Sequence, residues 1–180
     1  MSRYWALRTD QSRREFMWRE LRDGRLRQGW GYRSDQDLEL LARLRRGGSP
    51  LKDHQRDAWR GNRRLLPTEP GAMQVGDVVV FLHLPRYGAW SIARVTGGYR
   101  YEISEMPNAV DGTPDYGHIR DVELLTGEVP IDPERDAVSD GLRAAMRNRQ
   151  RMWSIDPWGE EVEQLAFAQS GVPSRRRPQR

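Results

Sequence analysis

The sequence predicts an α+β fold, in which a small, partly closed β-barrel has helices packed around it and a helical extension at its C-terminal end. Three observations lead to this prediction. The chain opens with an alternating, strand-like segment, continues with helical patterns over residues 12–66, and then carries several short strands on tight turns. We expect one domain over residues 1–130, the extension over 131–170 and a disordered basic tail over 171–180.

The N-terminal third is predicted to hold one strand and three helices. The stretch "RYWALRT" at residues 3–9 alternates between two faces, as a strand does. A helix is expected over residues 12–24, where a serine and a glutamate can form a capping box and a glycine ends the helix. The glycine-punctuated stretch 24–34 is predicted to be a loop, and two more helices are expected over residues 34–48 and 49–66.

The character of the sequence changes after this helical region. Four strands are expected at residues 74–84, 88–96, 97–104 and 118–125, each short and rich in β-branched or aromatic side chains. From Asp132 onward the pattern is helical again, with Trp and Pro residues as interruptions. Short strands on tight turns, together with an N-terminal strand, favour a barrel-like sheet over a parallel α/β sheet.

The composition points to a polyanionic partner. The chain has 30 Lys and Arg residues against 26 Asp and Glu residues, and Lys52 is its only lysine. The isoelectric point is about 9.8, so nucleic acid is the commonest partner to expect. The N-terminus lacks the apolar core of a signal peptide, and the run "VVVFL" is too short to span a bilayer. We therefore expect a soluble cytoplasmic protein.

The sequence argues against an enzyme. There is no cysteine, which excludes disulfides and thiolate metal sites, and the three histidines are scattered without metal-ligand spacing. Nucleases with a carboxylate pair need a lysine on a strand, whereas Lys52 lies in "SPLKD" at an expected helix start. No phosphate-binding loop and no nucleophile motif is present. We expect no catalytic residues, no metal and no cofactor.

Five segments in order resemble a known superfamily. They are "YWALRT", "WRGNRRL", "MQVGDVVVFLHL", "GAWSIARV" and "PDYGHIRDVEL", and together they span roughly residues 3–126. In this order they are similar to the PUA-like superfamily, and most closely to its EVE and YTH domains. Two departures stand out: residues 25–48 are longer than in a minimal EVE domain, and Pro85-Arg86-Tyr87 replaces a simpler hairpin turn.

The resemblance implies a reader of modified bases, because EVE and YTH domains insert such a base into an aromatic-walled pocket. In this sequence Trp59 matches the cage tryptophan, and Asn62 matches the polar residue that follows it. Trp30 and Tyr32 lie outside the match, on a glycine-flanked loop. The predicted pocket residues are Trp30, Tyr32, Trp59, Asn62, His83, Trp90 and Tyr116. Core packing is the stronger reading for Trp90, and a structural role is the safer one for His83.

Arginines beside the cage tryptophan are candidates for phosphate contacts, since phosphate contacts position a protein on nucleic acid. The predicted backbone contacts are Arg60, Arg63, Arg64, Arg86 and Arg94. Each of them could equally be an ordinary solvated charge.

The expected function is recognition of a base such as 5-methylcytosine, 5-hydroxymethylcytosine or N6-methyladenine, in DNA rather than RNA, by base flipping. The chain could be the recognition part of a modification-dependent restriction or defence system, with an effector nuclease reached through the extension. Two alternatives remain open. One is a protein-interaction scaffold that docks a partner through Trp153 and Trp158; the other is a structured-RNA binder without modification specificity.

Overall fold

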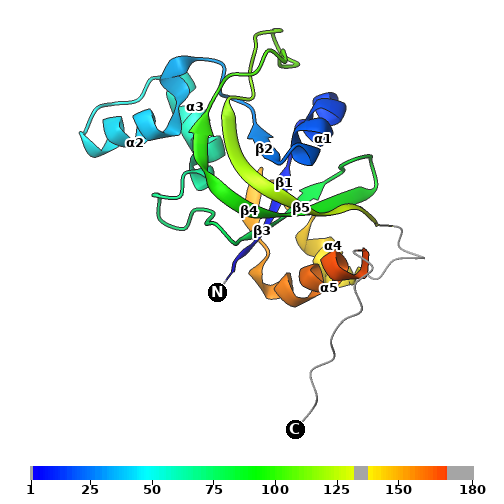
Figure 1. The fold of residues 1–180 in the computed structure, drawn as a ribbon. Coiled ribbons are helices and arrows are strands. Elements are labelled where there is room, and N and C mark those ends of the chain that lie inside the picture. Colours follow the sequence, from blue (N-terminus) through cyan, green and yellow to red (C-terminus); the bar gives the residue numbers. More distant parts are fainter. Residues whose placement is uncertain (1, 132–137, 170–180) are drawn as a thin grey trace.

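The computed structural model describes residues 2–131 and 138–169 and has an α+β fold (Figure 1). Six strands form one curled half-barrel sheet in the order β2-β5-β4-β3-β1-β6. Their bounds are β1 Tyr4–Arg8, β2 Arg25–Gln28, β3 Val78–Leu82, β4 Ala89–Tyr101, β5 His118–Pro130 and β6 Met152–Ser154. The predicted α+β class with a partly closed barrel is thereby confirmed.

Helices cover both faces of this sheet. The α-helices in the described part of the chain are α1 Arg14–Arg22, α2 Leu38–Arg46, α3 Asp53–Asn62, α4 Asp140–Ala145 and α5 Gly159–Gln169. Figure 1 shows α1, α2 and α3 above the sheet and α4 and α5 below it. None of the helices in the described residues combines the length and the apolar character that crossing a membrane requires.

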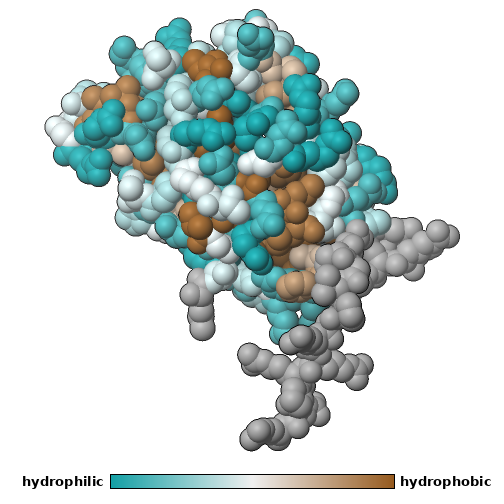
Figure 2. All heavy atoms as spheres, in the orientation of Figure 1, coloured by the Kyte–Doolittle hydropathy of each residue, from teal (hydrophilic) through white to brown (hydrophobic). Residues whose placement is uncertain are grey.

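The apolar run of β3 explains why the sheet is covered on two sides. All five residues of β3 are buried, and successive side chains point to opposite faces. Val79 and Phe81 join the hydrophobic cluster under α1–α3, while Val78 and Val80 join the cluster under α4 and α5. A strand with two buried faces has a continuous apolar sequence rather than an alternating one. Figure 2 shows apolar side chains gathered near the middle of the sheet, on a face that is otherwise largely polar.

Several predicted elements differ from the structure. The helix expected over residues 34–48 begins only at Leu38, after a 3-10 turn at Ser34–Gln36, and the strand expected at 118–125 extends to Pro130. The predicted loop at 24–34 contains the edge strand β2, which pairs antiparallel with β5. The expected strands at 88–96 and 97–104 are the single strand β4, because Gly97 and Gly98 lie in a register irregularity rather than in a turn. The third helix starts four residues later than expected, since the Gln55 side chain accepts a hydrogen bond from the backbone N–H of Lys52.

The C-terminal segment contributes to the same sheet. Strand β6 pairs antiparallel with β1, opposite residues 5–7. Trp153 on β6 is buried in the second cluster together with Leu142 of α4 and Val162 of α5. A C-terminal helix is confirmed, while the expected helix start at Asp132 and the predicted tail at 171–180 lie outside the described residues. The division at residue 130 stays a prediction.

Candidate ligand-binding pocket

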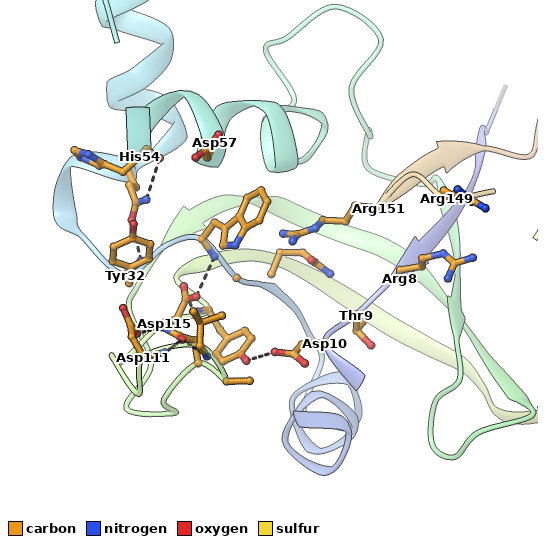
Figure 3. A pocket seen from close by; sticks show the side chains of 18 residues that line it. Arg8, Thr9, Asp10, Tyr32, His54, Asp57, Asp111, Asp115, Arg149 and Arg151 are labelled. Carbon is orange, nitrogen blue, oxygen red and sulfur yellow. Dashed lines mark hydrogen bonds between the residues drawn. The ribbon is translucent and has the colours of Figure 1, made fainter. Parts of the chain in front are cut away.

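A pocket of about 580 Å³ opens beside the C-terminal end of β1 (Figure 3). This volume lies in the range of sites that hold small molecules. The lining comes from five separate parts of the chain. These parts are residues 8–10, residues 28–36 (Gln28, Gly29, Trp30, Tyr32 and Gln36), His54 and Asp57, residues 108–116 (Asn108, Ala109, Val110, Asp111, Asp115 and Tyr116), and Arg149 with Arg151.

Trp30 is the exposed aromatic residue of this pocket. Its side chain is 43% exposed, and its backbone has a φ of 65°, in the left-handed region that non-glycine residues rarely adopt. One edge of the indole lies against α3, where a Cβ added to Gly61 would be 3.1 Å from Trp30 Cε3. A glycine at this position of α3 therefore allows the indole to approach the helix.

Asp115 holds the backbone around Trp30 in place. Its buried carboxylate accepts hydrogen bonds from the backbone N–H groups of Trp30 at 3.1 Å, Gly31 at 2.7 Å and Tyr116 at 2.6 Å. Tyr116 also has a left-handed backbone, with a φ of 64°. A left-handed non-glycine residue costs about 1–3 kcal/mol and persists only where its surroundings fix it. The three hydrogen bonds to one carboxylate supply that fixation.

A second chain of hydrogen bonds fixes the carbonyl side of Trp30. His118 Nε2 lies 3.1 Å from the Trp30 carbonyl oxygen, and His118 Nδ1 lies 2.9 Å from the Tyr99 hydroxyl. Burial lowers the pKa of His118 to about 4, so the imidazole is neutral at pH 7. A neutral imidazole has one N–H and one acceptor nitrogen. Nε2–H therefore donates to Trp30, and Nδ1 accepts from Tyr99.

The floor of the pocket is formed by Tyr116 and Asp10. The buried Tyr116 hydroxyl donates to Asp10 Oδ2 at 2.6 Å, and its ring packs at 5.3 Å from that of Phe16. Burial acts to raise the pKa of Asp10, but hydrogen bonds from Ser12 and Tyr116 outweigh it and hold this pKa below its usual value. Asp10 is therefore an ionised acceptor at neutral pH.

Arginines line the opposite side of the pocket. Figure 3 shows Arg8, Arg149 and Arg151 on one side, with Tyr32, Asp111 and Asp115 across from them. The Arg151 guanidinium lies 4.3 Å from the centroid of the Trp30 ring. Burial lowers the pKa of Arg151, yet an arginine stays protonated at pH 7. Within the described residues neither Arg149 nor Arg151 has a side-chain hydrogen bond or an ion pair, so both cations are available to a ligand.

The loop that carries these arginines is fixed by Arg8. Its side chain donates to the carbonyl oxygens of Asn148 at 3.0 Å and Met146 at 3.5 Å, and its guanidinium lies over the Trp153 ring. The C-terminal segment thus supplies two of the three arginines on this side of the pocket.

Two further polar groups face the pocket without a partner. Gln28 is only 3% exposed, and within the described residues its side-chain amide makes no hydrogen bond; its Nε2 is fully buried. The exposed carboxylate of Asp57 on α3 likewise has no hydrogen bond and no ion pair among the described residues.

The structure brings three of the predicted pocket residues together and leaves four elsewhere. Trp30, Tyr32 and Tyr116 line the pocket. The other four do not line it: Trp59 and Asn62 lie in the core behind the Trp30 loop, Trp90 lies in the second hydrophobic cluster, and His83 lies on the β3–β4 hairpin.

Trp59 and Asn62 support the pocket from behind. Trp59 is 3% exposed and packs in the first hydrophobic cluster, with the Arg45 guanidinium 5.0 Å from its ring centroid. Asn62 is fully buried, and its Nδ2 donates to the Gly29 carbonyl oxygen at 2.8 Å. The amide of Asn62 therefore holds the start of the Trp30 loop.

The five predicted phosphate-binding arginines fall into two groups. Arg60 and Arg63 are exposed, and neither lines the pocket. The others are held by the protein: Arg64 donates to the Met152 carbonyl oxygen, Arg86 pairs with Glu128, and Arg94 lies 3.8 Å from Glu163.

Sequence reasoning missed Asp115, His118, Gln28 and Arg151. Asp115 and His118 lie in the segment "PDYGHIRDVEL", but nothing in that segment indicates that they bind a loop more than 80 residues earlier. Among the described residues, no group of three or more His, Asp or Glu side chains could hold a metal ion.

No protein-family model matches the chain, and no curated protein matches it. Among solved structures, the chain is similar to protein Atu2648 from Agrobacterium tumefaciens, a structural-genomics target determined by X-ray crystallography. The two chains are 12% identical, the match covers 99% of this chain and 100% of the other, and the TM-score is 0.42.

Proposed function

We propose that this chain binds nucleic acid and takes one modified base, flipped out of its stack, into the pocket beside Trp30. The observation that carries the proposal is the fixed exposure of Trp30. Two separate hydrogen-bonding systems, through Asp115 and His118, hold an exposed indole in a strained backbone conformation at the mouth of a pocket. Strain maintained in this way is typical of ligand-binding sites.

An aromatic platform is what a flipped base needs. Unstacking a base costs a few kcal/mol, and stacking on an aromatic side chain returns about 1–3 kcal/mol. The pocket volume of about 580 Å³ is sufficient for a planar base with a substituent. Tyr32 and Tyr116 add aromatic surface to the same lining.

The polar groups of the pocket match the two ends of a nucleotide. Asp57 can accept from an exocyclic amino group of the base, and Gln28 adds a side-chain amide to the same lining. Arg149 and Arg151 can hold the phosphate on the other side. Because the acidic and the basic groups lie on separate sides of the pocket, the nucleotide would bind in one orientation, with its base toward Asp57 and its phosphate toward the arginines.

Discrimination by the modification itself is expected to be modest. One buried CH₂ group is worth about 0.8 kcal/mol, which corresponds to roughly a fourfold preference for a methylated base. A larger preference would require a polar substituent, such as a hydroxymethyl group, that pairs with Gln28 or Asp57.

The experiment that tests the proposal measures binding of matched DNA and RNA oligonucleotides, plain or carrying 5-methylcytosine, 5-hydroxymethylcytosine or N6-methyladenine, at two salt concentrations. We expect one modification to be preferred at both salt concentrations, since backbone contacts weaken with salt whereas base contacts do not. Trp30→Ala should abolish this preference, and Trp30→Phe should retain part of it.

Trp18→Ala is the matched control, because Trp18 lies on α1 and does not line the pocket. Equal binding of all oligonucleotides that disappears at high salt, or an unchanged preference in Trp30→Ala, would contradict the proposal.

The structure does not favour the scaffold alternative. Trp153, one of the two tryptophans expected to dock a partner, is buried in the second cluster and donates its indole N–H to the Ala145 carbonyl oxygen at 3.1 Å. Trp158 packs against the same cluster.

A further inference from the structure

We propose that Tyr87, supported by His83, is a stacking platform for the nucleotide next to the base in the pocket, so that the ligand is a single-stranded segment at this point. The inference rests on the proposed function and extends it from one nucleotide to two. It concerns the β3–β4 hairpin, residues 83–88, which takes no part in the pocket itself.

Tyr87 has a fixed ring with a free surface. Its side chain is 73% exposed, although a tyrosine is a large, partly apolar side chain. Its ring is stacked on that of His83, with a centroid distance of 4.6 Å and an angle of 10° between the planes. His83 covers one face of the tyrosine ring, and the opposite face is left for a further planar group.

His83 is itself held in position. Its backbone has a φ of 58°, in the left-handed region, and its Nδ1 accepts a hydrogen bond from the Gly88 backbone N–H at 3.3 Å. The hairpin is tied to β5 as well, because Arg86 Nε donates to Glu128 at 2.7 Å. A platform that is ordered before binding loses little conformational entropy when a base stacks on it.

The platform lies next to the pocket. β1 and β3 are parallel neighbours, and Arg8 at the end of β1 lies opposite Leu82 at the end of β3. The next residues, Thr9 and His83, therefore lie side by side, and Thr9 lines the pocket. Neighbouring strands lie about 4.8 Å apart. The Gln11 side chain also connects the two strand ends, since its Nε2 lies 3.4 Å from the Thr9 carbonyl oxygen and 3.3 Å from that of Leu82.

The groups between pocket and platform suit a phosphate. Burial lowers the pKa of His83, and the positive charges of Arg8 and Arg14 lower it further. Arg8 also lines the pocket, and Arg14 is hydrogen-bonded only to the Gln11 side chain among the described residues. A sugar-phosphate link that runs from pocket to platform would pass these two cations.

A duplex does not fit this arrangement, because a stacked neighbour in a duplex has both of its faces covered by adjacent base pairs. An exposed ring that offers one face instead suits an unstacked base, as in single-strand binding proteins. The site on Tyr87 is expected to be tolerant of sequence, since every base has a π-face.

The test is a double-mutant cycle on the full chain. The probes are single-stranded hexanucleotides that carry 5-hydroxymethylcytosine, 5-methylcytosine or N6-methyladenine at a central position. Each is made in three forms: intact, with an abasic nucleotide on the 5′ side of the modified base, and with an abasic nucleotide on its 3′ side. With the wild-type protein, we expect the abasic nucleotide on one of the two sides to weaken binding between about five- and a hundredfold.

Tyr87→Ala should weaken binding of the intact hexanucleotide by a similar factor and remove the effect of the abasic nucleotide. Tyr87→Phe should bind as the wild type does, and Val75→Ala, an exposed apolar residue on another loop, is the matched control. The corresponding modified mononucleosides occupy only the pocket, so their binding should be the same in Tyr87→Ala and wild type.

The outcomes separate the two proposals. If Tyr87→Ala binds the intact hexanucleotides as the wild type does, or remains equally sensitive to the abasic nucleotide, the platform is refuted while the base pocket stands. If Tyr87→Ala weakens plain and modified strands alike and no modification is preferred, the platform is supported and the modified-base pocket is refuted.

Discussion

Trp30 and Trp59 lie on neighbouring parts of the molecule but in opposite environments. Trp30 is 43% exposed on a loop, whereas Trp59 is 3% exposed in the middle of α3. Both depend on α3: Trp59 belongs to the helix, and the Trp30 indole lies against Gly61, two residues further along it. The tryptophan in the family-like motif is thus structural, and the one outside that motif faces the pocket.

The periodicity of α3 explains this division. Trp59 and Asn62 are three residues apart and share the buried face, together with Gln55 and Ala58. Asp57 and Gly61 are four residues apart and share the face toward the pocket. One helix can therefore anchor a core on one side and shape a binding site on the other, and each function uses different residues.

The largest expected effect comes from Trp59. Replacing a buried tryptophan by alanine leaves a cavity, and Trp59→Ala should lower the free energy of unfolding by about 3–5 kcal/mol. Chemical denaturation of the purified variant measures this loss. Trp30→Ala should cost far less stability than Trp59→Ala, about 1 kcal/mol, because Trp30 is 43% exposed and leaves no buried cavity.

The contrast between the two tryptophans would not hold if Trp59→Ala and Trp30→Ala lost similar amounts of stability and of binding preference. In particular, a Trp59→Ala protein of unchanged stability that had lost its preference for a modified base would place Trp59, and not Trp30, at the ligand.

Acid should destabilise the surroundings of His118 and Tyr99 before it affects α3. The unfolded chain takes up a proton on His118 below about pH 6.5, while the folded chain does so only near pH 4. The stabilisation by neutral His118 is thus complete above pH 6.5 and is lost as the pH falls toward 4, a change on the order of 2–3 kcal/mol. The hydrogen bond that protonation breaks is the one from the Tyr99 hydroxyl, because protonated Nδ1 can no longer accept it, whereas Nε2–H still donates to Trp30.

The measurement is the free energy of unfolding between pH 7 and pH 4, with amide hydrogen exchange to locate the change. His118→Gln should show a much flatter dependence on pH. His83→Gln is the necessary control, since burial also lowers the pKa of His83. If exchange accelerates in α3 as early as at the Leu38 N–H, which donates to the Tyr99 hydroxyl, His118 does not act through Tyr99 in particular.

Local patterns were sufficient for much of the fold and for little of the site. β1 and β3 were predictable because alternation and a continuous apolar run are properties of adjacent residues. β2, with two arginines in four residues, gives no such signal and is a strand only because the edge of β5 pairs with it. Trp30 was a candidate from its glycine neighbours, but its partner Asp115 is 85 residues away. Contacts at that separation depend on the folded sheet.

The smallest expected effect, and the finest test of the comparison, comes from Gly61. Alanine is favoured over glycine in a helix by about 0.5–1 kcal/mol, but a Cβ at this position would lie 3.1 Å from Trp30 Cε3 and must displace the indole by a few tenths of an ångström. The Trp30 backbone is fixed, but its partly exposed indole can shift by this amount, so Gly61→Ala should keep or slightly raise stability. Stacking on the displaced indole should weaken by about 1 kcal/mol, or roughly fivefold in the affinity for the preferred modified oligonucleotide. A variant that loses stability and keeps its affinity would show that the indole cannot move, and that the contact with α3 serves the core rather than the pocket.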